Sequence, residues 1–134
     1  MPPVHEGISG YVAGDKLNIR RIVPTIQTGR TLAKAWLTIK NAATDADPGL
    51  IQKVITSAAV PGTGQIVAIG DGTGGQPTGT GEVLFELTMT DTGTTLGPGK
   101  SFVFDIQLKF DNAEIATLSY GDLVFVRGVT DAAA

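Results

Sequence analysis

Cysteine is missing from this sequence, and histidine and tryptophan each occur only once among its 134 residues. The absence of cysteine excludes disulfides, thiolate metal sites and thiol nucleophiles, and it fits a chain that folds in a reducing cytoplasm. The single histidine, His5, would have to serve alone in any Ser-His mechanism, because no second imidazole is present. We therefore predict that the protein is not an enzyme.

The chain also has little positive charge and no long apolar run. Its net charge is −3 and its isoelectric point is near 4.9, and Arg20 and Arg21 are the only adjacent basic residues. A nucleic-acid binder normally carries a basic patch that neutralises phosphates, so we expect no nucleic-acid partner. No stretch of about 18 apolar residues is long enough to cross a membrane, and the N-terminus does not read as a secretory signal. We expect no membrane partner either.

The length and composition fit a single domain with a charge-poor surface. Charged residues make up 17% of the chain, against roughly 25% in average globular proteins. Such a surface suits a subunit that is partly buried against neighbours, although a Thr- and Gly-rich β surface gives the same composition. We divide the chain into an extended N-terminal arm at 1–13, rich in Pro and Gly, a β-sandwich domain at 14–130 and a short C-terminal tail at 131–134.

Alternation of apolar and polar residues is the clearest pattern that the sequence does contain. Between residues 102 and 110, one face of the expected strand carries only large apolar side chains, namely Phe102, Phe104, Ile106, Leu108 and Phe110. Similar short runs occur at 16–23, 30–41, 50–57 and 65–69, and a meander from Glu82 to Val126 contains four. This spacing predicts an all-β fold, an antiparallel β-sandwich or small barrel of about seven to eight strands.

Two details of this assignment allow alternatives. Residues 30–41 could form a short helix, because Leu, Ala and Lys favour helices, but the β-branched Thr38 and Ile39 favour a strand. Trp36, in the same run, is either an interface anchor, a platform for stacking a sugar, or a residue that closes the edge of the core. We favour the position at the edge of the core.

Acidic residues are the main candidates for a metal site or for catalysis. Asp45, Asp47 and Asp71 lie in expected loops, but the EF-hand spacing is absent, so we interpret them as solvated turn residues. Glu82, Glu86 and Asp105 occupy exposed positions of expected strands, and glycosidases use such carboxylates in pairs. Nothing places them in a cleft, and cross-strand pairing with Lys109 or Lys100 is the ordinary explanation. We predict no metal, no cofactor and no catalytic residue.

Glycines dominate residues 70–81, which read G-D-G-T-G-G-Q-P-T-G-T-G. A phosphate-binding loop would need a Lys-Ser/Thr pair that begins a helix, whereas this run has no lysine and precedes a strand. We interpret it as a long hairpin connection that contacts a partner or moves, and we name Gly74, Gly75, Gln76 and Pro77 as interaction candidates.

The order of the runs resembles a family of bacteriophage virion proteins. The segments L-A-K-A-W-L-T-I-K-N, G-E-V-L-F-E-L-T-M-T-D-T, P-G-K-S-F-V-F-D-I-Q-L-K and I-A-T-L-S-Y-G-D-L-V-F-V are similar in layout to the N-terminal immunoglobulin-like domain of phage baseplate upper proteins. The likeness spans most of residues 14–129. It implies an antiparallel immunoglobulin-like β-sandwich. It also implies a virion protein, made and folded in the bacterial cytoplasm, that docks onto capsid or tail and baseplate proteins as a homo-oligomer.

The resemblance places the expected contacts in segments around the sandwich. In the N-terminal arm we name Pro2, Pro3, Val4 and Tyr11, since an extended arm can add a strand to a neighbour's sheet. The alternative function is a carbohydrate-binding or adhesin-type module, with Trp36, Tyr11 or Tyr120 as stacking residues.

Overall fold

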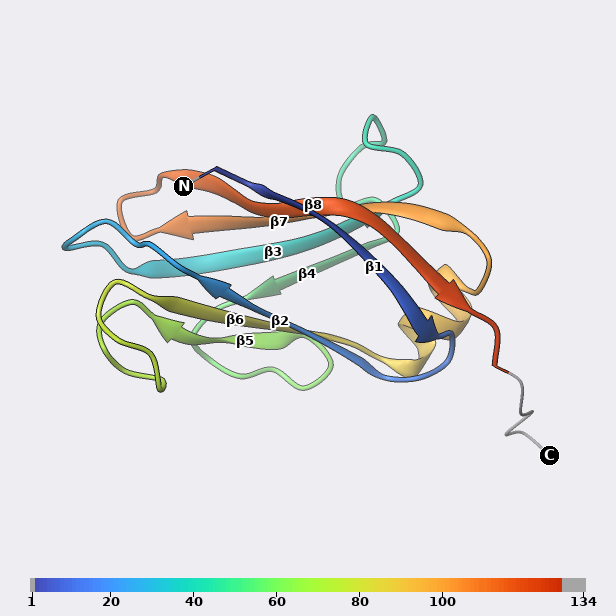
Figure 1. The fold of residues 1–134 in the computed structure, drawn as a ribbon, viewed down its shortest axis with the longest axis horizontal. Coiled ribbons are helices and arrows are strands. Elements are labelled where there is room, and N and C mark those ends of the chain that lie inside the picture. The colour runs from blue at the N-terminus through green and yellow to red at the C-terminus, as the bar shows by residue number, and fades with distance from the viewer. Residues whose placement is uncertain (1, 129–134) are drawn as a thin grey trace.

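Eight β-strands form two sheets packed face to face in the computed structural model, which describes residues 2–128 (Figure 1). The strands are β1 (Val4–Val12), β2 (Leu17–Val23), β3 (Leu32–Lys40), β4 (Ile51–Ile55), β5 (Gly64–Ile69), β6 (Gly81–Leu87), β7 (Ser101–Phe110) and β8 (Ile115–Val126), and a π-helical turn η1 (Asp91–Leu96) links β6 to β7. The larger sheet has the order β1-β8-β7-β3-β4, and the smaller has the order β2-β6-β5. The predicted β-sandwich is confirmed. Within the described residues, no helix has the length and apolarity to cross a membrane.

The pairing of the strands matches an immunoglobulin-like arrangement. The sets β2-β6-β5 and β8-β7-β3-β4 correspond to the B-E-D and G-F-C-C′ strands of that fold. All pairs are antiparallel except one: β1 runs parallel to β8. The first strand is therefore an edge strand of the larger sheet.

The core lies between the two sheets, and the expected alternation of apolar residues builds it. Phe102, Ile106 and Leu108 of β7 are almost fully buried. They belong to one cluster with the inward residues of β3 and with Val83, Phe85 and Leu87 of β6. Each large side chain buried in this way contributes about 1.5–3 kcal/mol to stability. The expected inner face of β7 is thus correct from Phe102 to Leu108, while Phe110 is only partly buried.

The segment from Glu82 to Val126 is not one meander. Strand β6 belongs to the smaller sheet, and the chain crosses through η1 to reach β7 in the larger one. The last two expected strands are one continuous strand, β8, although Gly121 lies in its middle. A Cβ atom at Gly121 would overlap the backbone carbonyl oxygen of Glu6 in β1. This glycine therefore marks the close approach of two strands and not a turn.

The N-terminal segment expected as an arm at 1–13 is mostly strand β1. Val4–Val12 is hydrogen-bonded to β8, and Ile8 is buried in the core. Its glycines had suggested a loop, but Gly10, with φ of +84°, lies at a bulge between Ile8 and Tyr11 where the register shifts. The tail expected at 131–134 lies outside the described residues.

Candidate functional site

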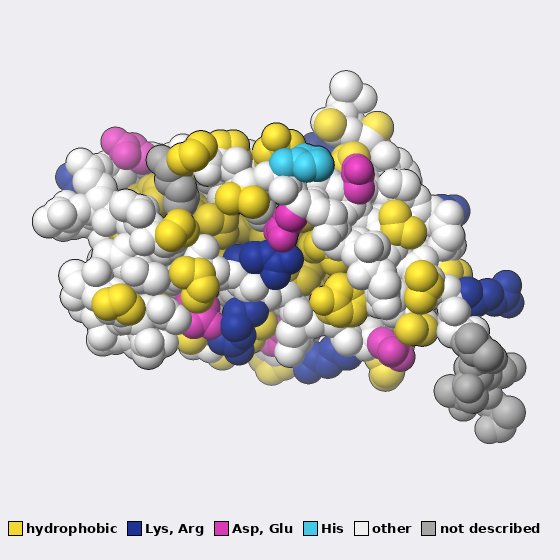
Figure 2. Space-filling model, in the orientation of Figure 1, with side chains coloured by type: hydrophobic (Ala, Val, Ile, Leu, Met, Phe, Trp, Pro, Cys, Tyr) yellow, Lys and Arg dark blue, Asp and Glu magenta, His cyan; other side chains and the backbone are white. Residues whose placement is uncertain are grey.

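A groove separates the two sheets on the side where their edge strands β1 and β2 lie. Figure 2 shows apolar side chains gathered on this face, around a few charged ones. The cavity has a volume of about 520 Å³, and its lining is mostly apolar: Pro2, Val4, Glu6, Arg21, Ile22, Pro24, Thr25, Leu118 and Ser119. We call it the edge groove.

Large apolar side chains around the edge groove are exposed to solvent. Val4 is 60% exposed and Ile22 is 46% exposed. The two charged residues of the groove neutralise one another, because Arg21 Nε donates a hydrogen bond to Glu6 Oε1 at 2.9 Å. Ser119 Oγ is buried and has no hydrogen-bond partner among the described residues. The groove thus offers mainly apolar contacts, because the Ser119 hydroxyl lies beneath its surface.

Both strands beside the edge groove have a free side. Strand β1 ends the larger sheet and β2 ends the smaller one. From Val4 to Ile8 the register of β1 with β8 is regular, and it is interrupted only beyond Ile8. A regular edge strand presents unpaired N–H and C=O groups to which an extended segment can pair. The open stretch of β1 lies next to the apolar groove.

The structure divides the predicted interaction residues between two regions. Pro2 and Val4 line the edge groove, and Pro3 lies exposed between them. Tyr11, which is 49% exposed, lies beyond the β1 bulge and does not line the groove. Sequence reasoning missed Ile22 and Pro24, because their strand carried no sign that it would lie beside the N-terminal segment.

The glycine loop, which contains Gly74, Gly75, Gln76 and Pro77, connects β5 to β6 as a hairpin. It folds back on its own sheet: a Cβ at Gly74 would overlap the Val67 carbonyl oxygen. Gln76 Nε2 donates a hydrogen bond to Glu82 Oε1 at 3.1 Å. These residues do not line the edge groove.

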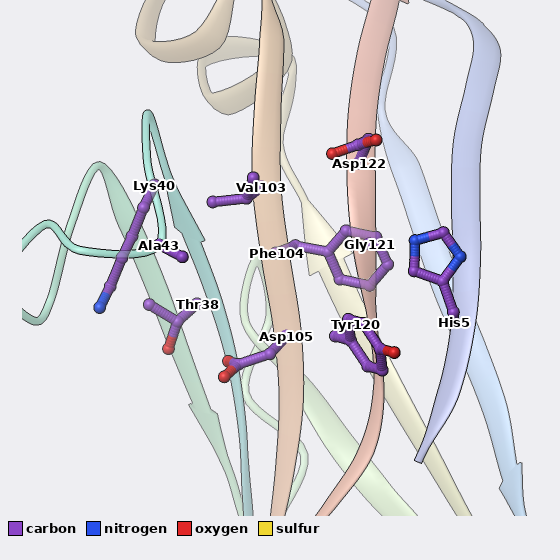
Figure 3. A pocket seen from close by; sticks show the side chains of 10 residues that line it. All are labelled: His5, Thr38, Lys40, Ala43, Val103, Phe104, Asp105, Tyr120, Gly121 and Asp122. Atoms are coloured by element: carbon purple, nitrogen blue, oxygen red, sulfur yellow. The ribbon is translucent and has the colours of Figure 1, made fainter.

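A second cavity lies on the outer face of the larger sheet, away from the core. One row of residues crosses this face from strand to strand, because His5, Tyr120, Asp105, Thr38 and Gln52 are successive register partners. The cavity has a volume of about 270 Å³, and its lining includes the first four residues of the row together with Lys40, Ala43 and Asp122. Figure 3 shows Asp105 lying between Thr38 and Tyr120, with His5 on the far side of Tyr120.

The carboxyl group of Asp105 in this cavity has a raised pKa. Burial raises the pKa of its carboxyl group, the nearby Lys40 lowers it, and Asp47 raises it again, so that the pKa lies above its ordinary value of 3.8. Lys40 is already held by Asp47, at 2.8 Å between Nζ and Oδ1, and by the carbonyl oxygen of Asp45 at 2.8 Å. The Asp105 carboxylate is thus half-buried without a cation of its own.

We expect the substitution Asp105→Asn to increase the stability of the folded protein at neutral pH by about 0.5 kcal/mol, the scale of a surface substitution. A carboxyl group whose pKa is raised on folding destabilises the fold above that pKa, and this cost disappears below pH 3.8 where both states are protonated. Urea unfolding at pH 7 and pH 3 measures the difference. Equal stability of the two proteins at pH 7 would contradict the assignment.

The other candidate carboxylates have structural partners that differ from those expected. Glu82 was expected at an exposed position but is buried. It pairs with Arg20, whose hydrogen bond is the main reason that the pKa of Glu82 is lowered. Glu86 pairs with Lys16 at 3.2 Å. Neither pairs with Lys100 or Lys109, because β6 lies in the opposite sheet from β7.

The loop aspartates serve turns and ion pairs. Asp45 accepts a hydrogen bond from the Ala42 backbone N–H, and Asp71 accepts one from the backbone N–H of Thr73. Asp47 pairs with Lys40. Within residues 2–128, no group of three or more acidic or imidazole side chains is placed to hold a metal ion.

Trp36 does not close the edge of the core. It lies on the outer face of β3, opposite the buried Ala35 and Leu37, and lines a third cavity of about 350 Å³. Lys34 Nζ lies 5.9 Å from the centroid of its ring. The indole is therefore at a surface and not within the sandwich.

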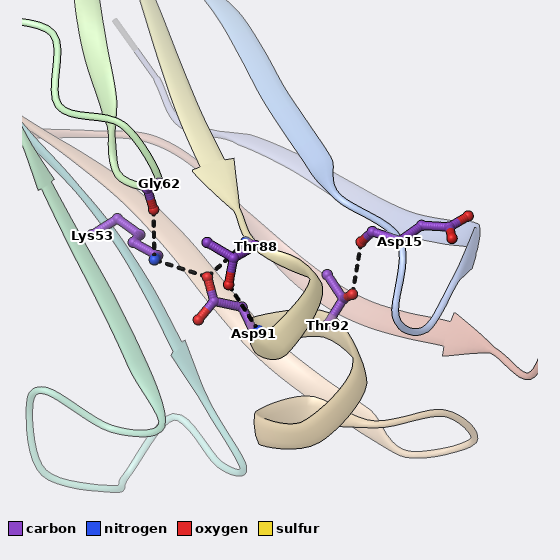
Figure 4. Close-up of polar contacts among 6 residues, drawn as sticks. All are labelled: Asp15, Lys53, Gly62, Thr88, Asp91 and Thr92. Atoms are coloured by element: carbon purple, nitrogen blue, oxygen red, sulfur yellow. Dashed lines mark hydrogen bonds and ion pairs between the residues drawn. The ribbon is translucent and has the colours of Figure 1, made fainter. Parts of the chain in front are cut away.

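A mostly buried ion pair joins β4 to η1 at one end of the sandwich (Figure 4). Lys53 Nζ of β4 lies 2.8 Å from Asp91 Oδ2 of η1 and donates a hydrogen bond to the Gly62 carbonyl oxygen at 2.9 Å. Asp91 also accepts a hydrogen bond from the Thr88 backbone N–H at 2.8 Å. The side chains of Lys53 and Asp91 are only 14% and 16% exposed, so this cluster holds elements together and offers no open site.

The fold defines the class of this protein as an immunoglobulin-like β-sandwich domain. Comparisons with protein-family models, with curated proteins and with solved structures find no match for the chain. Its function is therefore argued from the two surfaces described above.

Proposed function

We propose that this protein is a non-enzymatic structural subunit of a bacteriophage particle and docks onto neighbouring virion proteins through the edge groove. The observation that carries the proposal is the apolar groove between two free strand edges, with Val4 and Ile22 largely exposed beside it. Surfaces of this kind are usually covered by a partner. The resemblance of the sequence to phage baseplate domains supports a virion partner.

The occupant of the edge groove would be an extended apolar segment of an adjacent capsid or tail protein. Its backbone would pair with the free side of residues 4–8, and its side chains would cover Val4 and Ile22. Strand addition of this kind gains affinity from backbone hydrogen bonds and specificity from the pockets for alternate side chains. The neutralised Glu6–Arg21 pair fits a segment without charge.

Two features beside the groove also limit non-specific pairing of other strands with β1. The bulge at Gly10 interrupts β1 beyond Ile8, and prolines flank the open stretch at Pro2, Pro3 and Pro24. Bulges and prolines are devices by which edge strands avoid aggregation. A short open stretch favours one specific partner. Several copies of the subunit would then occupy symmetry-related positions in the particle.

The test is incorporation into particles produced from a genome whose only copy of this gene encodes Val4→Asp together with Ile22→Asp. Burying the two native side chains is worth about 1.5–3 kcal/mol each, so we expect incorporation to fall by about 100-fold or more. Quantitative mass spectrometry of purified particles measures the copy number.

The matched control is Val60→Asp, since Val60 is 49% exposed and lies in the β4–β5 connection, outside the groove. This variant should be incorporated normally. Absence of the unaltered protein from purified particles would contradict a virion function, whereas normal incorporation of the double variant would contradict docking through the groove.

A further inference from the structure

The cavities on the outer face of the larger sheet form one continuous trough. The cavity near His5 and the cavity near Trp36 share the residues Thr38, Lys40 and Asp105. The trough thus extends over β1, β8, β7, β3 and β4, and its floor is the row of register partners that ends at Gln52. We call it the outer-face trough.

The loop between β3 and β4 forms one wall of the trough. Figure 1 shows this loop projecting beyond the larger sheet, on the side away from the smaller one. Lys40 holds it there through Asp47 and the Asp45 carbonyl oxygen, and Ala43 and Asp47 contribute to the lining. A flat sheet face is in this way converted into a bounded cavity.

Two aromatic residues lie at different ends of the trough. Tyr120 is 43% exposed, and the ring of His5 meets it edge-on with 5.1 Å between the centroids. Trp36 lines the other end, next to Gln52 and Gln107. Neither Tyr120 nor Trp36 belongs to the core cluster, so packing does not explain their place on this face.

The polar groups of the floor include both hydrogen-bond donors and hydrogen-bond acceptors. The Asp105 carboxylate only accepts hydrogen bonds when ionised, whereas the amides of Gln52 and Gln107 both donate and accept. Gln52 is oriented by its own hydrogen bond, which it donates from Nε2 to Thr38 Oγ1 at 3.1 Å. A ligand that fits this floor must carry several groups that donate and accept at once.

We propose that the outer-face trough binds a saccharide, with hydroxyl groups on the polar row and pyranose faces against Tyr120 and Trp36. Sugar hydroxyls both donate and accept, and the apolar C–H face of a pyranose ring packs on an aromatic ring. Carboxylates of Asp105 and Asp122 would repel the phosphates of a nucleic acid. Strand addition is excluded on this face, because the sheet's backbone groups are used in its own ladders.

This site is separate from the edge groove. Along β1 the side chains alternate, so that His5 faces the trough while Val4 and Glu6 face the groove. Saccharide binding and docking into a particle can therefore occur together, and loss of one leaves the other intact.

The experiment uses the whole chain on an array of oligosaccharides built from glucose, galactose, rhamnose and N-acetylglucosamine. Calorimetry with the strongest binder then compares the Tyr120→Ala and Asp105→Asn variants with the unaltered protein. We expect each substitution to raise the Kd about tenfold, the scale of one lost stacking or charge-assisted contact.

The matched control is Tyr11→Ala, because Tyr11 is as exposed as Tyr120 but lines neither cavity of the trough. It should leave the Kd unchanged, and circular dichroism should show that all three variants are folded. Absence of binding to every arrayed saccharide, or an equal loss in the Tyr11→Ala variant, would overturn the proposal without bearing on incorporation into particles.

Discussion

Replacing Gly121 with alanine is expected to displace β1 from β8 and to lower the free energy of unfolding by about 3 kcal/mol. The new Cβ would overlap the carbonyl oxygen of Glu6, and backbone atoms cannot move aside as a flexible side chain does. The strands must then separate around the pair Glu6 and Gly121, which are register partners. Urea unfolding measures the loss, and hydrogen exchange of the β1 amides locates it.

Gly7→Ala is the matched control for this substitution. Gly7 lies next to Glu6 in the same strand, but a Cβ there meets no atom within 4 Å and its φ is not positive. It should change stability by less than about 1 kcal/mol. If Gly121→Ala is as stable as Gly7→Ala, the close approach of β1 and β8 is wrong, and with it the position of the edge groove.

The substitution Asp91→Asn is expected to destabilise the protein by about 3 kcal/mol at neutral pH. It leaves the mostly buried Lys53 ammonium group without its counter-ion. Removing one partner of a fully buried ion pair costs about 3–5 kcal/mol, and this pair falls at the low end because its side chains are 14% and 16% exposed. The loss should be smaller when both residues become apolar, as in Lys53→Met with Asp91→Leu, because no charge is then left unpaired.

The effect of Asp91 should also depend on pH. Burial opposes ionisation of its carboxyl group, but hydrogen bonds from Lys53 and the Thr88 backbone outweigh it, so the pKa lies below its ordinary value of 3.8. The stabilisation is therefore fully present above the pKa of the unfolded chain and is lost as the pH falls through the folded pKa. The difference in unfolding free energy between the two proteins should narrow below pH 3.8.

Glu86→Gln provides the comparison with an exposed pair. Its partner Lys16 has a side chain that is 59% exposed, and solvent-exposed ion pairs contribute about 0–1 kcal/mol. Urea unfolding at pH 7 measures the loss of unfolding free energy in each variant. Equal losses in Asp91→Asn and Glu86→Gln would contradict a stabilising role of the Lys53–Asp91 ion pair.

Periodicity predicted the strands well, because each strand buries one face and the side chains alternate. The inward residues of β7 from Phe102 to Leu108 follow from this rule alone. In β3 the rule fails at the start of the strand, because a register shift between Leu32 and Lys34 buries Leu32 and leaves Ala33 exposed. It could not assign strands to sheets, since β6 and β7 look alike in sequence and the turn η1 between them gives no sign that the chain changes layers. Glycine was the other source of error: four strands were expected between Glu82 and Val126, but the last two are one strand through Gly121, where the close contact with Glu6 requires a glycine.

The candidate surfaces depended on contacts between distant parts of the chain. Pro2 and Val4 could be named from the N-terminal sequence, but Ile22 and Leu118 join them only because β1 lies beside both β2 and β8. For the same reason Asp105 seemed an ordinary surface carboxylate until the β3–β4 loop and Tyr120 were placed around it. The sequence could not show which face of β3 carries Trp36, because an aromatic residue can lie on either face of a strand and both of its neighbours along the chain are apolar.

The parallel pairing of β1 with β8 joins the first strand of the sandwich to the last. During synthesis β1 emerges from the ribosome long before its partner, so its pairing is among the final steps of folding. Contacts so distant along the chain form slowly. The edge groove, which needs Leu118 and Ser119 of β8, is thus completed only when nearly the whole domain has been made, and an interrupted chain would lack a finished groove.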